Sequence, residues 1–231
     1  MIITLSRQLG AGARSTGERL CQEFNCQFLD NTLIPMVARQ LRTDEHSVAR
    51  LDEHPDPLLT RVLRTFYASA PETSMIVDAE PEVTADDVAR VTQAVITEMA
   101  AHESLVVTGR GARWVVGDRD DALHVHLVAP LPIRVRRVAR KDNIGQQAAE
   151  QLVRQADHDR AAYIRRYYHA VWGDPENYHL VINTGWLPLD GVVAIIKDAA
   201  IRISGESLQT LAPSPVPPEG DTTERSRPDQ T

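Results

Sequence analysis

The chain has 231 residues, of which 42% are apolar, and this is enough for one complete hydrophobic core. A formal net charge of -7 makes it a poor general binder of nucleic acid, although a local basic cluster can still hold one small anion. The sequence has no run of about 18 consecutive apolar residues, and its first residues lack the basic and apolar regions of a secretory signal. We therefore expect a cytoplasmic protein with no membrane or nucleic-acid partner, whose oligomeric state the sequence leaves open.

Short apolar runs and helical patterns alternate along the first half of the chain. We expect, in chain order, a strand at 2–5, a helix at 15–24, a strand at 28–29, a helix at 33–41, a loop around 52–57, a helix at 58–67, an irregular segment at 71–81 and a helix behind Thr84. Thr84 and Asp87 have the spacing of a capping box, which indicates where that last helix begins.

The alternation continues in the second half. We expect strands at 105–108, 123–128 and 180–183, a basic helix ending near 140, a polar helix at about 146–169 and a helix at 189–203. From Gly205 the apolar pattern is lost and Pro, Ser, Thr and Glu accumulate, so residues 205–231 are predicted to form a disordered tail. The basic run in the first of these helices is typical of a solvated helical face; it comprises Arg134, Arg136, Arg137 and Arg140.

This order of elements predicts an α/β domain with a parallel sheet covered on both faces. In such sheets ligands bind beyond the carboxyl ends of the strands. Four of the predicted strand ends carry polar or glycine residues, namely Ser6 with Arg7, Asp30, Gly109 with Arg110, and Asn183. A binding site for a phosphate or a sugar is therefore expected at this edge of the sheet.

Residues 6–16, which we call the glycine loop, have the context of a phosphate-binding P-loop. A strand leads into a glycine-bearing turn and then into a helix start, where backbone N–H groups can converge on an anion. The standard signature GxxxxGK[ST] is not met, because Arg7 replaces the first glycine and Ala13 replaces the lysine. Arg14 is the only cation in the second half of the loop. An ordinary glycine-rich turn between strand and helix is the alternative interpretation.

Six segments together suggest a family. They are ITLSRQLGAG at 3–12, FLD at 28–30, VVTGRGA at 106–112, VHLVAP at 125–130 with the arginines up to 140, DHDR at 157–160 and YHLVINT at 178–184. In this order, over about residues 1–200, the chain resembles the cytidylate kinase-like family of the P-loop nucleoside monophosphate kinase superfamily. No one segment is decisive, but the ordered set is fairly specific.

The resemblance implies an α/β fold, the P-loop kinase three-layer sandwich with a five-stranded parallel sheet. One domain would cover residues 1–204, with a helical acceptor-binding insertion at about 31–100 and a short lid at about 140–165, followed by the tail at 205–231. It also implies a phosphotransferase that uses ATP and Mg²⁺ and acts on small nucleotide substrates, CMP or dCMP in the family.

Carried over to this sequence, the resemblance implies a set of site residues. The donor nucleotide would lie on Gly10, Ala11, Gly12, Ala13, Arg14, Ser15 and Thr16, with Mg²⁺ next to Ser15. Acceptor binding would fall to Asp30, Arg110 and Asp159. The catalytic cations would be Arg14, Arg140 and Arg160. Arg14 would replace the missing lysine, since its planar and permanently charged guanidinium suits phosphate.

Several of these residues also have plain structural interpretations. Ser15 can satisfy backbone groups at the start of its helix, and Asp30 can cap the helix that follows it. Arg160 can form an ion pair within its own helix, for example with Asp157 or Asp159.

Two departures from the classical cytidylate kinases leave the function open. Those enzymes carry a lysine where Ala13 stands and a cytosine-reading aspartate where Gly111 stands. Besides a CMP-like kinase, two functions therefore remain: a nucleotide-binding regulatory module without catalysis, and a kinase for a non-nucleotide small molecule.

Overall fold

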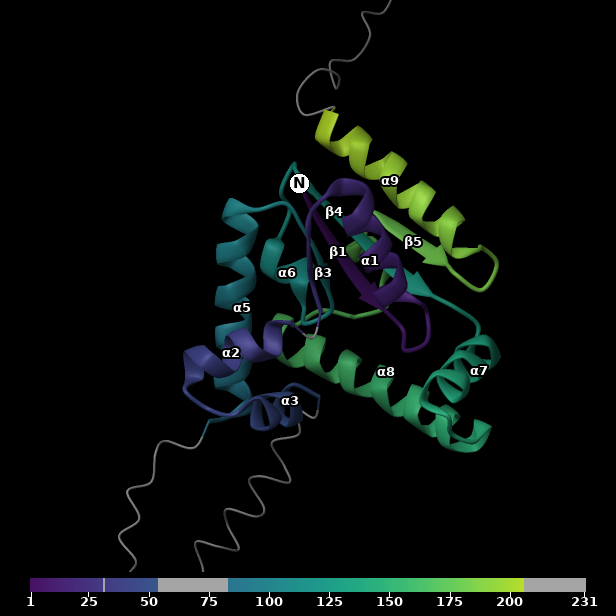
Figure 1. Ribbon diagram of the computed structural model, residues 1–231, viewed down its shortest axis with the longest axis horizontal. Coiled ribbons are helices and arrows are strands. Elements are labelled where there is room, and N and C mark those ends of the chain that lie inside the picture. Colours follow the sequence, from purple (N-terminus) through teal and green to yellow (C-terminus); the bar gives the residue numbers. More distant parts are fainter. Residues whose placement is uncertain (31, 54–82, 206–231) are drawn as a thin grey trace, which may run out of the picture.

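The structure is a computed structural model that describes residues 1–30, 32–53 and 83–205 (Figure 1). Within these residues the strands form one five-stranded parallel sheet in the order β2-β3-β1-β4-β5. The strands are β1 (Ile2–Arg7), β2 (Gln27–Leu29), β3 (Leu105–Thr108), β4 (Ala122–Val128) and β5 (Leu180–Asn183). The predicted strands are confirmed, and β1 extends further than expected because Ser6 and Arg7 still pair with β4.

The helices cover both faces of this sheet. They are α1 (Ala13–Phe24), α2 (Leu33–Leu41), α3 (Glu45–Glu53), α5 (Ala85–His102), α6 (Ala112–Val116), α7 (Leu131–Asp142), α8 (Gln146–Tyr168), the 3₁₀ turn η1 (Pro175–Asn177) and α9 (Leu189–Gly205). Successive strand residues face opposite sides, as the pleat requires: Ile2 joins the core under α2, α3, α5 and α6, whereas Ile3 joins the core under α1 and α9. The predicted three-layer α/β sandwich is confirmed (Figure 1).

Local details test the remaining expectations. The capping box of α5 is present, since the Asp87 N–H donates to Thr84 Oγ1 and the Thr84 N–H donates to Asp87 Oδ2, both at 3.2 Å. The loop expected around 52–57 is wrong at its start, because α3 continues through Glu53, and α6 was not predicted. Gly205 belongs to α9 rather than to a tail.

Other expectations lie outside the described residues or have no test. The predicted helix at 58–67, the irregular segment at 71–81 and the tail from residue 206 are not among the residues described. The division into an insertion and a lid stays a prediction. Among the described helices, none is both long enough and apolar enough to cross a bilayer.

Two histidines occupy the interior of β4. His124 and His126 are almost completely buried. His124 is satisfied on both ring nitrogens, with Thr4 Oγ1 at 2.8 Å from Nδ1 and the Gly117 carbonyl at 2.9 Å from Nε2. Nδ1 of His126 has no partner among the described residues, and the ring stacks on Tyr178 at 4.8 Å. Burial lowers the pKa of both imidazoles to about 4, so both are neutral at pH 7.

The lowered pKa values of these two buried histidines predict that the protein loses stability in mild acid. The unfolded chain protonates each histidine near pH ~6.5, but the folded chain does so only near the lowered pKa of about 4. The contribution of the neutral histidines to the free energy of unfolding is complete above the unfolded pKa. It is lost as the pH falls from the unfolded pKa to the folded pKa. We expect His126→Phe to weaken the pH dependence of the free energy of unfolding, measured by urea denaturation between pH 7 and 4.5. An unchanged pH dependence in this variant would contradict the assignment.

Candidate functional site

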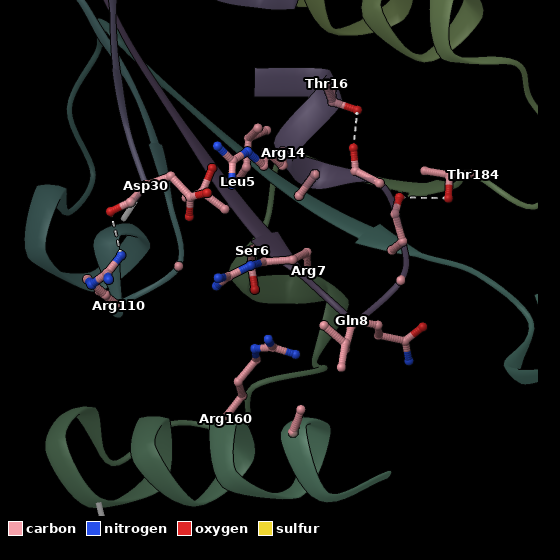
Figure 2. Close-up of a pocket in the computed structure, with 18 of the residues that line it drawn as sticks. Leu5, Ser6, Arg7, Gln8, Arg14, Thr16, Asp30, Arg110, Arg160 and Thr184 are labelled. Atoms are coloured by element: carbon pink, nitrogen blue, oxygen red, sulfur yellow. Dashed lines mark hydrogen bonds between the residues drawn. The ribbon is translucent and has the colours of Figure 1, made fainter. Parts of the chain in front are cut away.

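A cavity of about 840 Å³ opens beyond the carboxyl ends of β1, β2 and β3. Its lining comes from the glycine loop and the start of α1, the turn after β3, α7, α8 and the segment after β5. The volume is in the range of small-molecule sites, which is ~300–1,000 Å³. Figure 2 shows five charged side chains from separate elements around this space: Arg7, Arg14, Asp30, Arg110 and Arg160.

The glycine loop leads into the open N-terminus of α1. Gly10 and Gly12 have φ angles of +82° and +85°. A Cβ on Gly10 would lie 2.8 Å from the carbonyl oxygen of Arg134, whereas a Cβ on Gly12 would meet nothing within 4 Å. Gly12 caps α1 without a side-chain hydrogen bond, and the first amides of a helix have no acceptor within the helix. The positive end of α1 therefore faces the cavity, which suits an anion.

The carbonyl groups of the same loop are held from the outside. They accept hydrogen bonds at 2.9–3.2 Å, as follows: Leu9 O from Arg134 Nη1, Gly10 O from Arg137 Nη1 and Ala11 O from Thr184 Oγ1. Each bond ties the negative end of a peptide dipole to a group outside the loop. The conformation that exposes the first amides of α1 is therefore fixed before any ligand binds.

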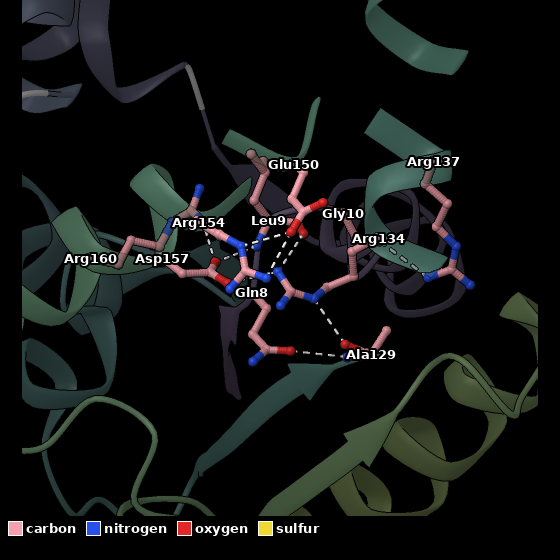
Figure 3. Close-up of polar contacts among 10 residues, drawn as sticks. All are labelled: Gln8, Leu9, Gly10, Ala129, Arg134, Arg137, Glu150, Arg154, Asp157 and Arg160. Atoms are coloured by element: carbon pink, nitrogen blue, oxygen red, sulfur yellow. Dashed lines mark hydrogen bonds and ion pairs between the residues drawn. The ribbon is translucent and has the colours of Figure 1, made fainter. Parts of the chain in front are cut away.

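Arg134 corrects the prediction of a solvated basic face. Its side chain is buried, donates to the Ala129 carbonyl at 2.9 Å and pairs with Asp157 at 2.7 Å (Figure 3). Asp157 Oδ1 also accepts the Leu9 N–H at 2.9 Å. We call Arg134 and Asp157 the loop clamp, because they join α7, α8 and the glycine loop.

Arg14 and Asp30 both line the cavity. The Arg14 guanidinium pairs with Glu18 one turn along α1 at 3.0 Å, and its side chain is 62% exposed. Glu18, with a smaller contribution from Asp30, raises the pKa of Arg14. The N-cap of α2 is Thr32, with no side-chain cap. The alternative interpretation of Asp30 as the cap of that helix is therefore wrong, and its carboxylate remains at the cavity.

Arg110 lies in a turn with a left-handed backbone. The φ angles of Gly109, Arg110 and Gly111 are +76°, +51° and +68°. For a residue other than glycine this conformation costs roughly 1–2 kcal/mol, and such strain clusters at functional sites. The Arg110 side chain lines the cavity and donates to the Asp30 carbonyl at 2.8 Å.

Helix α8 brings Arg160 and Asp159 to the cavity. Arg160 pairs with Asp157 at 3.4 Å, so the expected ion pair within the helix coexists with a place in the lining. Burial lowers the pKa of Arg160, but a guanidinium stays charged in proteins. Asp159 accepts a hydrogen bond from Gln155 at 2.8 Å.

Arg140 is the predicted site residue that the structure does not bring to the cavity. It is exposed, and α7 lines the cavity with Arg137, Val138, Lys141 and Asp142 instead. Residues 134, 137, 138 and 141 share one helical face, from which position 140 points away. Of the other predicted residues, Ser15 and Thr16 line the cavity, and the Thr16 hydroxyl donates to the Gly12 carbonyl at 3.0 Å.

Arg7 lines the cavity and was not among the predicted site residues. The sequence did place Arg7 at a polar strand end, the position that carries ligand contacts in parallel sheets, but the family resemblance gave it no role. Gly111 is covered by the ring of Tyr168, which a Cβ at this position would overlap. That ring stacks on Trp114 with a centroid distance of 5.5 Å.

The parallel sheet, the glycine loop and the open helix N-terminus define an α/β domain of the P-loop kinase type. A model of the cytidylate kinase-like family matches residues 2–185. The chain therefore belongs to this family, as the sequence segments suggested.

Individual relatives are more distant. A cytidylate kinase from Thermococcus sibiricus is 39% identical over 104 residues, which make up 44% of this chain and 52% of that protein. A cytidylate kinase from Methanosphaerula palustris is 25% identical over 186 residues, 80% of this chain and 88% of that one. An uncharacterized protein from Eubacterium ventriosum has a similar fold, with a TM-score of 0.64 at 18% identity over 87% of this chain and 98% of that chain.

Proposed function

We propose that this protein transfers the γ-phosphate of ATP to a nucleoside monophosphate, with CMP or dCMP as the first acceptors to test. The observation that carries the proposal is the open N-terminus of α1, which faces a cavity surrounded by arginines from other elements. Phosphoryl transfer requires the protein to position two anions and to neutralise the charge that develops between them. The described side chains are of the kind that this task needs.

The donor phosphates would bind at the N-terminus of α1. The amides of Ala13, Arg14 and Ser15 would donate to them, and the open space above Gly12 leaves room for an oxygen. Mg²⁺ would be held by the Ser15 hydroxyl and the Asp30 carboxylate, both oxygen donors at the cavity. Bound Mg²⁺ neutralises phosphate oxygens and keeps several waters, so few protein ligands suffice. Among the described residues, no group of three His, Cys, Asp or Glu side chains is placed to hold a metal ion.

The acceptor would lie on the other side of the cavity. Arg110 would hold its phosphate, because this arginine lines the cavity beside Asp30, whose carbonyl it contacts at 2.8 Å. Asp30 and Asp159 would orient the remaining polar groups, and Arg160 would cover the phosphates from α8 and help to exclude water.

A second candidate is a kinase for a non-nucleotide small molecule. Gly111 favours it, since this position has no side chain to read a base and the Tyr168 ring covers it.

The test is ADP release from ATP and Mg²⁺ against CMP, dCMP, UMP, AMP, GMP and a set of small hydroxylated acceptors. Turnover that depends on CMP or dCMP is expected. Turnover with a hydroxylated acceptor alone would favour the second candidate. Stabilisation by ATP without ADP release would indicate a binding module. If the protein shows neither ADP release nor stabilisation by ATP, a nucleotide site is excluded.

Arg110 provides a sharper prediction for the same assay. We expect Arg110→Gln to lower kcat/KM for the acceptor by about 10²–10³, because one charge-assisted contact to a phosphate is lost. The matched control is Arg136→Gln, since Arg136 is an exposed arginine that does not line the cavity. Equal activity in both variants would contradict the role of Arg110.

A further inference from the structure

The glycine loop raises the question of which cation replaces the P-loop lysine. Ala13 stands at the lysine position and carries no charge. Backbone amides can bind the donor phosphates, but the group in transfer also needs a nearby positive charge. The identity of this cation depends on the proposed function, because it concerns the same site.

Arg14 is the obvious candidate from the sequence, but its surroundings argue against it. The guanidinium pairs with Glu18 along the outside of α1 at 3.0 Å, and the side chain is 62% exposed. Such a pair at i and i+4 is a feature of a solvated helix surface. The Arg14 guanidinium is therefore held against the Glu18 carboxylate at the edge of the cavity.

Two arginines of α7 hold the glycine loop by hydrogen bonds to its carbonyl groups. Arg134 is buried against Asp157 and the Leu9 carbonyl. Arg137 donates to Thr184 and to the Gly10 carbonyl from outside the loop. Both arginines hold the loop in shape, and neither takes the place of the lysine.

Arg7 approaches the same space from the sheet. It is the last residue of β1 and pairs with Leu127 of β4, so the strand fixes its backbone. Its guanidinium lies directly on the backbone of Gly109, since a Cβ at that position would overlap it. In Figure 2 the Arg7 side chain extends into the cavity between the Arg110 turn and Arg160.

The position of Gly109 supports a functional placement of Arg7. Gly109 has a φ of +76° and opens the left-handed turn that presents Arg110. The left-handed backbone favours glycine at this position, and a side chain here would displace the tip of Arg7. The turn that carries Arg110 therefore also contacts the Arg7 guanidinium, and both arginines line the cavity.

We propose that the guanidinium of Arg7 contacts the phosphoryl group in transfer and so takes the role of the P-loop lysine. An oxygen of the acceptor phosphate forms the new P–O bond, while the bond to the β,γ-bridging oxygen breaks and ADP leaves with its electron pair. Arg7 donates N–H groups to the non-bridging oxygens and neither gains nor loses a proton. Gly109 is a positioning residue, because it makes room for this guanidinium.

Binding of inorganic polyphosphates tests the contact without any turnover. Calorimetry would compare tripolyphosphate, which is long enough to fill the α-, β- and γ-positions together, with pyrophosphate, which needs only the α- and β-positions. We expect Arg7→Gln to weaken tripolyphosphate binding at least tenfold and to leave pyrophosphate within about threefold, whereas Arg136→Gln changes neither. If Arg7 has only a structural role, Arg7→Gln will weaken the binding of both anions to the same extent, and this result would overturn the proposal.

Turnover and two further variants complete the test. We expect kcat to fall by about 10²–10³ in Arg7→Gln. The loss should be smaller in Arg7→Lys and smallest in Arg14→Gln. Gly109→Ala is expected to reproduce the selective loss of tripolyphosphate binding. If Arg7→Gln does not fold, as judged by circular dichroism, Arg7→Lys with an intermediate loss carries the test.

The possible failures are distinguishable. Selective loss of tripolyphosphate binding in Arg14→Gln but not in Arg7→Gln would assign the charge to Arg14 and overturn the inference alone. If the unmodified protein binds both polyphosphates but phosphorylates no acceptor, the proposed kinase function fails, and the binding comparison still decides the Arg7 contact. If it binds neither polyphosphate, both proposals fail.

Discussion

Replacing Arg134 with methionine is expected to lower the free energy of unfolding by about 3–5 kcal/mol, the cost of breaking a buried ion pair. The substitution leaves Asp157 without its partner at 2.7 Å, and it removes the donor to the Leu9 and Ala129 carbonyls. Asp157 keeps a weaker contact with Arg160 at 3.4 Å, which limits the loss. Urea denaturation at pH 7 would measure it.

The control for this prediction lies two residues away. Arg136 is exposed on the same helix, so Arg136→Met should change stability by no more than ~0.5 kcal/mol. The double variant Arg134→Met with Asp157→Leu should recover part of the loss, because no unpaired charge remains buried. Similar stability of Arg134→Met and Arg136→Met would mean that the loop clamp contributes little.

The loop clamp also links stability to binding. Asp157 accepts the Leu9 N–H, and Arg134 donates to the Leu9 carbonyl, so both sides of one residue of the glycine loop are held. A loop that is ordered in advance binds an anion without the entropic cost of ordering it. Arg134→Met should therefore weaken pyrophosphate binding even though Arg134 does not touch the anion.

The sequence predicted the layers of this fold better than its details. The apolar runs of β1, β3 and β4 are buried in the sheet, and burial of a strand depends mainly on its own pattern. The edge strand β5 buries Ile182 but leaves Val181 exposed. Helix α6 was missed because it has only five residues, and such a short helix is stabilised by the core it packs on more than by its own residues.

Charged residues show where prediction from the sequence ends. Arg134 and Arg140 look alike in the basic run, yet Arg134 is buried and Arg140 is exposed. The difference depends on Asp157, which lies 23 residues further along the chain, and on Leu9, which lies 125 residues before Arg134. The environment of a charge is set by such distant neighbours, which the local pattern does not contain.

Gly111 illustrates the same point in the acceptor half of the cavity. From the sequence this glycine only removes a possible base-reading side chain. In the structure it also makes room for Tyr168, whose hydroxyl accepts a hydrogen bond from Gln93 at 3.1 Å and whose ring stacks on Trp114. Helix α8 is thereby packed against the turn that carries Arg110.

Gly111→Ala is therefore expected to lower the free energy of unfolding by about 2–5 kcal/mol. A left-handed φ of +68° costs a residue with a side chain ~1–2 kcal/mol, and forcing the Tyr168 ring away adds about 1–3 kcal/mol of overpacking. Gly12→Ala is the control, because Gly12 has a φ of +85° but nothing within 4 Å of its added Cβ. That variant should lose the backbone part alone, as measured by thermal unfolding without ligand.

A double-mutant cycle separates the two contributions in Gly111→Ala. Removing the ring with Tyr168→Leu costs stability by itself, since the stack on Trp114 and the hydrogen bond from Gln93 are lost. In the Tyr168→Leu background, however, Gly111→Ala should cost only about as much as Gly12→Ala, which gives a coupling of about 1–3 kcal/mol. Additive losses would mean that α8 moves away from the turn to accept the methyl group. The tight packing of Tyr168 on Gly111 would then not be what holds α8 against Arg110.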